Sequence, residues 1–236
     1  MRTIVLQHIE CEPPGVYEDV LLDRGAVIER VELDRGDPLP ALDGARLLVV
    51  MGGPMGAYQD HAHPWLTAEK RYLAEAVTAG LPVFGACLGA QLLAAATGGR
   101  AYPGQGPEVG LLPVELTEAG RLDPVTGGLP SSFDTLQWHG DTFDLPPGAV
   151  RLAGSDAYPN QAYRLGPSYA VQFHLEVPAG LAAQWAAIPA YAQALNDVLG
   201  PGAAPVLLAD YAARCEELNG YARLLFARFL DQAWAQ

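Results

Sequence analysis

Val83-Phe84-Gly85-Ala86-Cys87-Leu88-Gly89-Ala90-Gln91 joins a short apolar run to a stretch of helical period. The apolar run 81–84 predicts a strand, and Pro82 must lie at its start because proline cannot donate to a β-ladder. The chain then turns sharply at residues 85–89 and enters a predicted helix over residues 90–97. This segment therefore predicts a strand, a tight turn and a helix in direct succession.

The same alternation extends over the first hundred residues. Short apolar runs predict strands over residues 3–6, 27–33 and 46–51. Between them, apolar residues at helical spacing predict helices over residues 14–24 and 65–79. Strands that alternate with helices are typical of α/β proteins, so we predict an open, mostly parallel twisted sheet with helices on both faces.

Beyond residue 100 the alternation loosens. Residues 111–116 and 168–173 predict two further strands, separated by turn-rich segments. The tail 205–236 is amphipathic and predicts helices packed on the main sheet, with an interruption at Asn219-Gly220. Because no linker or repeat divides the chain, we expect residues 1–236 to form a single domain with a helical C-terminal segment from about residue 179.

Composition argues against several classes of function. The 14 Lys and Arg residues stand against 27 Asp and Glu residues, and the formal net charge is −13. A nucleic-acid-binding protein needs a clustered basic face, so we expect neither a nucleic-acid partner nor an anionic membrane partner. Residues 1–20 contain no long uncharged apolar run, so we expect neither a signal peptide nor a membrane span.

Cysteine usage indicates a reducing compartment. The three cysteines are an odd number at wide spacing, which argues against a disulfide framework. No CxxC motif or Cys/His cluster indicates zinc, and we predict no metal and no cofactor. Together with the expected lack of a signal peptide, these features predict a cytoplasmic protein.

Cys87 has the sequence context of a nucleophile. Gly85-x-Cys87-x-Gly89 has the form of a nucleophile elbow, with cysteine in the position where hydrolases carry serine. The flanking glycines allow strand and helix to approach closely, and the N-terminus of the following helix favours thiolate over thiol. A buried structural cysteine beside a glycine-rich turn has the same pattern, so the motif needs independent support.

A His-x-Glu motif supplies that support. His174 and Glu176 follow a predicted strand, and residues two apart in an extended chain project to the same side. Glu176 can therefore orient the imidazole of His174, which can act as a base toward Cys87. Both motifs lie at strand ends of one α/β pattern, where such sheets bind their ligands.

Gly52-Gly53-Pro54 follows the predicted strand 46–51 and forms a third element of the same site. Its backbone can aim an N–H group at a developing oxyanion, alongside the N–H group of Leu88 directly after the nucleophile. A plain Gly-Pro turn is the alternative interpretation of this segment. His8, near the end of the first predicted strand, is expected to be a core or rim histidine.

Four blocks in this order resemble class I glutamine amidotransferase domains, most closely the GMP-synthase-like branch. The blocks are Met51–Met55, Gly85–Gln91, Gln137–Phe143 and Gln172–Glu176. The resemblance extends from about residue 40 to 178 and implies the flavodoxin-like α/β fold of that family. Two positions depart from the family pattern, since Ala90 stands where many members have His or Tyr and Leu175 where many have Pro.

The resemblance implies a role for each matching residue. It makes Cys87 the nucleophile, His174 the general base and acid, and Glu176 the residue that orients His174. It makes Gly53 and Leu88 the oxyanion donors. The positions that match its substrate-binding segments are Gln91 and the loop of His139, Gly140 and Asp141.

The family resemblance leaves several functions open. The first is a stand-alone glutamine amidotransferase or glutaminase that acts on glutamine, either free or handing ammonia to a separate synthase subunit, because we expect no synthase domain in this chain. The second is a γ-glutamyl hydrolase or peptidase that uses the same triad on other γ-glutamyl compounds. The third is a non-catalytic regulatory relative, and a redox sensor is disfavoured by the His-x-Glu motif. The sequence leaves open whether the chain forms a homo-oligomer.

Overall fold

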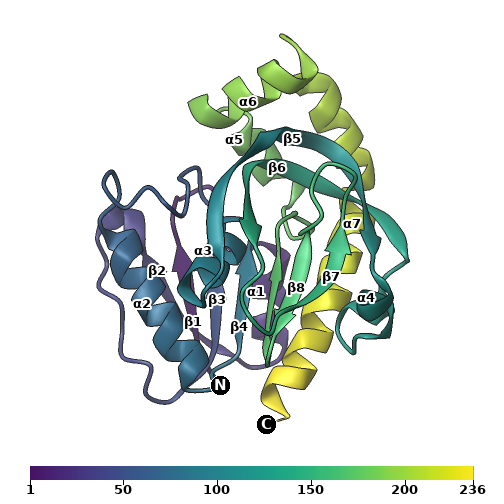
Figure 1. Ribbon diagram of the computed structural model, residues 1–236. Coiled ribbons are helices and arrows are strands. Elements are labelled where there is room, and N and C mark those ends of the chain that lie inside the picture. Colours follow the sequence, from purple (N-terminus) through teal and green to yellow (C-terminus); the bar gives the residue numbers. More distant parts are fainter. Residues whose placement is uncertain (236) are drawn as a thin grey trace.

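The structure, a computed structural model, describes residues 1–235, and within this range the strands form one nine-stranded sheet (Figure 1). The strand order is β2-β1-β3-β4-β9-β8-β7-β5-β6. The first part of this sheet is parallel and consists of β1 (Arg2–Gln7), β2 (Val27–Glu32), β3 (Ala45–Val50), β4 (Val83–Ala86) and β9 (Ser168–Val171). The prediction of an α/β fold is confirmed.

The remaining part of the sheet is antiparallel, so the sheet is mixed rather than purely parallel. It consists of β5 (Arg100–Leu116), β6 (Ser132–Asp144), β7 (Val150–Gly154) and β8 (Ala162–Leu165). The sequence predicts only residues 111–116 of β5 and none of β6, β7 and β8. The first half of β5 contains Pro103, Gly104, Gly106 and Pro107, which are residue types depleted in strands.

Helices cover both faces of the parallel part. The helices of the described residues are α1 (Val16–Asp23), α2 (Trp65–Thr78), α3 (Leu88–Ala96), α4 (Glu118–Leu122), α5 (Ala179–Trp185), α6 (Pro189–Leu199) and α7 (Ala204–Trp234), with short 3₁₀ turns at Leu33–Arg35 and Thr126–Gly128. Of these, α4 and α6 pack on the antiparallel strands β7 and β5 instead. Leu47 and Val49 of β3 share a core cluster with α1 and α7, whereas Leu48 and Val50 share the other cluster with α2 and α3. Alternate residues of a buried strand therefore anchor opposite helical layers.

Helix α7 corrects one sequence prediction, because the expected interruption at Asn219-Gly220 is wrong. The helix is continuous from Ala204 to Trp234, and Gln236 lies outside the described residues. The side-chain nitrogen of Asn219 donates to the carbonyl oxygens of Leu175 at 2.7 Å and Val177 at 3.3 Å. The Asn219 side chain thus makes a tertiary contact, and Asn219 does not end the helix.

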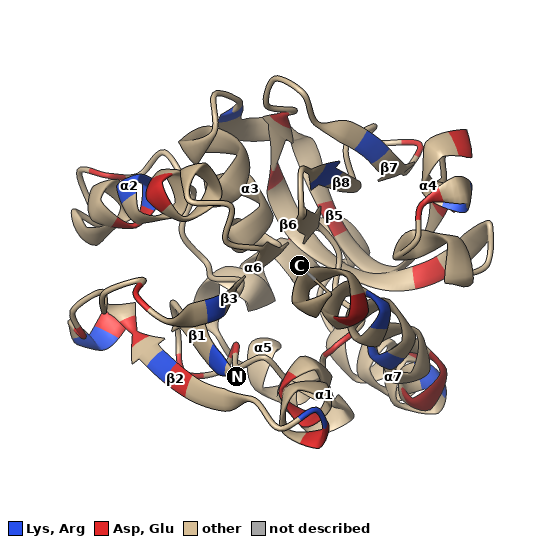
Figure 2. Ribbon diagram, turned by 90° about the horizontal axis from the view of Figure 1, so that it is seen from below, with Lys and Arg blue, Asp and Glu red and all other residues tan. Residues whose placement is uncertain are grey.

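Charged residues of both signs are interspersed along α7 (Figure 2). Two ion pairs join this helix to α1 and the residue after it, from Arg223 to Asp19 at 2.8 Å and from Asp231 to Arg24 at 2.7 Å. All four side chains are substantially exposed, so we expect each pair to contribute less than about 1 kcal/mol to stability. In residues 1–235, no helix combines the length and the apolar character that crossing a membrane requires.

Candidate active site

Cys87 lies in a strained turn between β4 and α3. Its φ angle is +52°, and among residues 1–235 it is the only residue other than glycine in the left-handed region. The Cys87 N–H donates to the carbonyl oxygen of Val171 on β9 at 2.8 Å, while the Cys87 carbonyl oxygen accepts from Ala90 and Gln91 in the first turn of α3. Such a conformation costs roughly 1–3 kcal/mol and persists because both neighbouring elements hold it.

Close approach of backbones explains the two glycines of the elbow. A Cβ atom on Gly89 would lie 2.1 Å from the carbonyl oxygen of Val50 at the end of β3. A Cβ atom on Gly85 would lie 2.7 Å from the carbonyl group of Gly89. Any side chain at either position would push α3 away from the sheet and displace Cys87.

Two glutamine side chains connect the Cys87 thiol to the pocket. The side-chain nitrogen of Gln172 donates to Sγ of Cys87 at 3.4 Å, and the side-chain oxygen of Gln172 accepts from Gln91 at 3.1 Å. Gln91 thereby orients the amide of Gln172 with its donor toward the sulfur. Gln172 thus places an N–H donor beside the sulfur at the N-terminus of α3.

His174 and Glu176 form a buried pair next to Cys87. Nδ1 of His174 lies 2.7 Å from Oε1 of Glu176, and each side chain is 2% exposed. The other carboxylate oxygen accepts from the Leu175 N–H at 3.0 Å, and the ring of Trp185 packs edge-on against the imidazole with centroids 4.7 Å apart. His174 follows β9 and is held by a pair of backbone hydrogen bonds to Leu136 of β6.

The surroundings of His174 favour its charged form. Burial lowers the pKa of His174, but the Glu176 carboxylate and hydrogen bonds to Cys87 and Glu176 outweigh this effect and hold the pKa well above 6.5. An imidazolium stabilised in this way beside a thiol is what a thiolate–imidazolium ion pair requires.

Gly53 and Leu88 lie side by side next to Cys87. A Cβ atom on Gly53 would be 3.1 Å from Cδ2 of Leu88, and Gly53 lines the same pocket as Cys87. Leu88 is the first residue of α3, where backbone N–H groups have no partner inside the helix. Both residues thus lie at the same end of the pocket as Cys87 or directly beside it in the chain.

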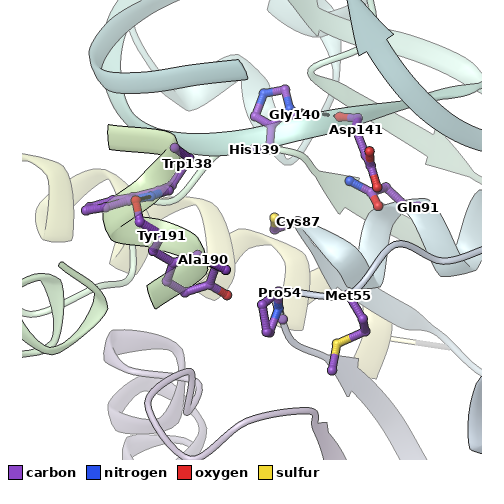
Figure 3. A pocket seen from close by; sticks show the side chains of 12 residues that line it. Pro54, Met55, Cys87, Gln91, Trp138, His139, Gly140, Asp141, Ala190 and Tyr191 are labelled. Carbon is purple, nitrogen blue, oxygen red and sulfur yellow. Dashed lines mark hydrogen bonds between the residues drawn. The ribbon is translucent and has the colours of Figure 1, made fainter. Parts of the chain in front are cut away.

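A pocket of about 180 Å³ opens above Cys87 (Figure 3). Gln91 and Asp141 lie on one side of the sulfur, and Trp138 and Tyr191 lie on the other. The remaining lining residues come from the loop after β3, from β6 and from α6, and are Gly53, Pro54, Met55, His139, Gly140, Ala190 and Ala194. The cavity is smaller than the roughly 300–1,000 Å³ typical of drug-sized ligands and indicates a ligand of about amino-acid size.

His139, Gly140 and Asp141 line this pocket from a strand, so the expectation of a loop is wrong. The ring of His139 is held on both sides, because Nδ1 lies 2.8 Å from the carbonyl oxygen of Asp141 and Nε2 lies 3.1 Å from Glu108. The carboxylate of Asp141 accepts from the hydroxyl of Tyr58 at 3.2 Å, and burial raises the pKa of Asp141.

Glu12 and Tyr191 belong to the site but carry no sequence signal. The hydroxyl of Tyr191 on α6 donates to Oε1 of Glu12, and a Cβ atom on Gly52 would lie 2.0 Å from Oε2 of Glu12. Burial raises the pKa of Glu12, although the charge of His174 and the Tyr191 hydroxyl oppose this effect. These residues are 179 positions apart in the chain, so no local motif could have indicated the contact.

Among the described residues, no group of three or more His, Cys, Asp or Glu side chains could hold a metal ion.

Comparison with known proteins provides independent findings. The family model for class I glutamine amidotransferases matches residues 18–184, more than half of the chain. The glutamine amidotransferase-like protein YfeJ of Salmonella typhimurium is 34% identical over 181 residues, which are 75% of this chain and 76% of that protein. The glutamine-hydrolysing GMP synthase of Thermomicrobium roseum is 39% identical over 131 residues, which are 55% of this chain and 23% of that enzyme. One subunit of the glutamine-hydrolysing GMP synthase of Pyrococcus abyssi is 37% identical over 100 residues, which are 41% of this chain and 52% of that polypeptide. A crystal structure of a glutamine amidotransferase from Thermotoga maritima matches with a TM-score of 0.87 and 31% identity over 98% of both chains.

Proposed function

The chain belongs to the class I glutamine amidotransferase family, and we propose that it hydrolyses the side-chain amide of glutamine to glutamate and ammonia. The observation that carries this proposal is the strained Cys87 at the N-terminus of α3, beside a His174 that Glu176 orients. A nucleophile, a base and an orienting group in this arrangement are the parts that covalent amide hydrolysis needs. We assign these three residues the catalytic roles.

The first step is attack of the Cys87 thiolate on the side-chain carbonyl carbon of glutamine. The new S–C bond forms as the carbonyl π electrons move onto oxygen, which becomes a tetrahedral oxyanion. We assign the N–H groups of Gly53 and Leu88 to this oxyanion, because preorganised donors stabilise the charge where it develops. The thiolate starts as an ion pair with the His174 imidazolium, which the raised pKa of His174 supports.

The second step releases ammonia and then glutamate. The His174 imidazolium gives its proton to the amide nitrogen, the C–N bond breaks, and ammonia leaves a γ-glutamyl thioester on Cys87. Neutral His174 then removes a proton from water, the resulting hydroxide attacks the thioester, and the C–S bond breaks with its electron pair returning to sulfur. The balance is one glutamine and one water consumed for one glutamate and one ammonia.

The pocket supports glutamine as the substrate. Its small volume fits an amino acid, and the Asp141 carboxylate offers an acceptor for the α-ammonium group. Gln91 lies on the same side of Cys87 and contributes a second polar group, and Gly140 brings backbone close to this end of the pocket. Both ring nitrogens of His139 have partners within the protein, so we assign His139 to the wall of the substrate pocket.

A separate synthase subunit is the proposed acceptor of the ammonia. The described residues form one sheet with its helices, and the relative from Pyrococcus abyssi is one subunit of a glutamine-hydrolysing GMP synthase. We propose that this chain likewise supplies ammonia to a partner. Pull-down followed by measurement of glutamine hydrolysis with and without the captured protein tests this point.

The activity test measures glutamate release from glutamine and from a panel of γ-glutamyl amides and peptides, by the wild type and Cys87→Ala. The proposal predicts turnover of glutamine that Cys87→Ala abolishes. Turnover restricted to γ-glutamyl peptides would replace it with the γ-glutamyl hydrolase alternative. A Cys87 that also fails to react with a diazoketone analogue of glutamine would indicate a non-catalytic relative.

A further inference from the structure

A buried histidine contacts the Gly52-Gly53 segment through the Gly52 carbonyl oxygen. His8, at the end of β1, is completely buried, and its Nδ1 lies 3.0 Å from the carbonyl oxygen of Gly52. On its other side Nε2 lies 2.9 Å from Oε1 of Glu69 on α2, which is also completely buried. The ring stacks on Trp65 with centroids 5.5 Å apart and an interplanar angle of 16°. His8 therefore has a fixed position and two fixed partners.

Peptide geometry links His8 to the pocket. The carbonyl group of Gly52 and the N–H group of Gly53 belong to one planar trans peptide unit, so they point in opposite directions. Because His8 holds the Gly52 oxygen from behind, the Gly53 N–H must point away from His8. Gly53 lines the pocket beside Cys87 and Leu88, and a Cβ atom on Gly53 would lie 3.0 Å from Cβ of His8. The two sides of this peptide thus face His8 and the pocket.

The proton on Nδ1 of His8 is fixed by its partner. A backbone carbonyl oxygen only accepts hydrogen bonds, so Nδ1 must carry a proton. Glu69 can meet Nε2 as a carboxylate facing an imidazolium or as a carboxylic acid facing a neutral ring, and Nδ1 is the donor in both cases. The Gly52 carbonyl therefore fixes the Nδ1 proton, and Glu69 holds the opposite side of the ring.

Stability alone gives a poor account of this pair. A completely buried ion pair or its neutral form contributes little net stability compared with well-packed apolar side chains of the same size. Within residues 1–235, Oε2 of Glu69 is buried without a hydrogen-bond partner, which adds a cost. A function for the pair in the site explains why polar groups occupy this position.

We propose that His8, held by Glu69 and Trp65, is a positioning residue that orients the Gly52–Gly53 peptide so that the Gly53 N–H faces the oxyanion. The inference rests on the proposed function, because it assigns His8 to the oxyanion-binding part of that reaction. His8 touches neither the substrate nor Cys87 and acts only through the peptide.

The test compares His8→Leu with His8→Asn. Asparagine places its side-chain N–H close to the position of Nδ1 and keeps the donor to Gly52, whereas leucine removes it. Loss of one oxyanion donor lowers kcat by roughly 10²–10³-fold, so a misoriented donor should lower kcat by about 10–100-fold in His8→Leu while KM stays within about threefold. We expect His8→Asn to recover most of this loss, and Glu69→Gln to give an intermediate value.

Two further measurements distinguish a misoriented Gly53 N–H group from a general disruption of the fold. A glutamine analogue with an aldehyde in place of the amide adds reversibly to Cys87 and forms the same tetrahedral oxygen, so its affinity should fall with kcat in His8→Leu. Alkylation of Cys87 by iodoacetamide forms no oxyanion, and its rate should stay at the wild-type value. Circular dichroism and thermal unfolding identify any variant that fails to fold, in which case His8→Asn and Glu69→Gln carry the comparison.

The inference is overturned if His8→Leu keeps wild-type kcat and aldehyde affinity, or if His8→Asn is impaired as much as His8→Leu. Failure of the proposed function has a different signature, because the wild type would then neither turn over glutamine nor bind the aldehyde more tightly than Cys87→Ala does.

Discussion

Replacement of Glu176 by glutamine tests the His174–Glu176 pair with the smallest change in shape. In the wild type one carboxylate oxygen faces Nδ1 of His174 at 2.7 Å and the other accepts from the Leu175 N–H at 3.0 Å. Glutamine has only one side-chain acceptor oxygen. In either orientation of its amide, the NH₂ group therefore faces a donor, which is either Nδ1–H of His174 or the Leu175 N–H, and that donor loses its hydrogen bond.

The magnitude follows from the hydrogen bonds that Glu176→Gln removes. A buried hydrogen bond to a charged group contributes about 1.5–3 kcal/mol, and this range applies to both contacts because each uses an oxygen of the same carboxylate. If the glutamine NH₂ group turns toward His174, the imidazole must adopt the tautomer with its proton on Nε2, which cannot accept a proton from Cys87. Since one of these bonds is lost and about 1.4 kcal/mol corresponds to a tenfold change in rate, we expect kcat to fall by about 10–10²-fold.

The assay follows glutamate release from glutamine as a function of pH, together with the rate of Cys87 alkylation by iodoacetamide. Loss of the Glu176 charge removes a cause that raises the pKa of His174, so the imidazolium beside Cys87 should be less stable and alkylation near pH 7 should slow. Glu176→Asp is the matched control, because it keeps the charge and only shortens the side chain by one methylene group. A Glu176→Gln enzyme with kcat within threefold of the wild type and an unchanged alkylation profile would refute this reasoning.

Three further predictions follow from other contacts. Gly89→Ala places a Cβ atom 2.1 Å from the Val50 carbonyl oxygen, so we expect it to lower the free energy of unfolding in urea by about 1–3 kcal/mol, and an unchanged midpoint would contradict the required close approach. Asn219→Ala leaves the carbonyl oxygen of Leu175 without its side-chain donor, while Val177 keeps the Tyr211 hydroxyl, and should cost about 1–2 kcal/mol, whereas an exposed control such as Arg223→Ala should cost less than about 1 kcal/mol. Burial raises the pKa of Glu12, so the folded chain holds this proton above the unfolded pKa of about 4.3, and that stabilising contribution is lost as pH rises from there through the folded value. Glu12→Gln should therefore gain stability relative to the wild type as pH increases, and a difference independent of pH would show that Glu12 titrates normally.

The parallel part of the sheet could be predicted because its strands are short, apolar and separated by helices. The run from Leu47 to Val50 is buried on both faces, so its composition alone distinguishes it from its surroundings. In the antiparallel part only residues 111–116 of β5 gave such a signal. In β5 and β6 exposed polar residues, prolines and glycines interrupt the apolar pattern, and their pairing depends on the rest of the sheet.

The candidate site divides in the same way. Cys87, His174 and Glu176 lie in local motifs whose spacing implies their geometry, and Gly53 and Leu88 were indicated by the turns that carry them. The other groups reach the site through contacts between residues far apart in the chain. The spacing of residues in the sequence therefore could not indicate them. Those groups are His8, Glu12, Glu69, Trp185 and Tyr191, which reach the site from β1, the loop after it, α2, α5 and α6.

Helix α7 shows why local signals mislead. Asn219-Gly220 has the composition of a helix end, but the Asn219 side chain bonds to the segment that carries Glu176, and the helix continues beyond it. Packing against the sheet outweighs the helix propensity of two residues.

The most direct measurement of the central claim is mass spectrometry of the protein quenched with acid during turnover of glutamine. The account predicts a γ-glutamyl adduct on the peptide that contains Cys87, present in the wild type and absent in Cys87→Ala. Glutamine turnover without any adduct on Cys87, and equally fast in Cys87→Ala, would contradict it.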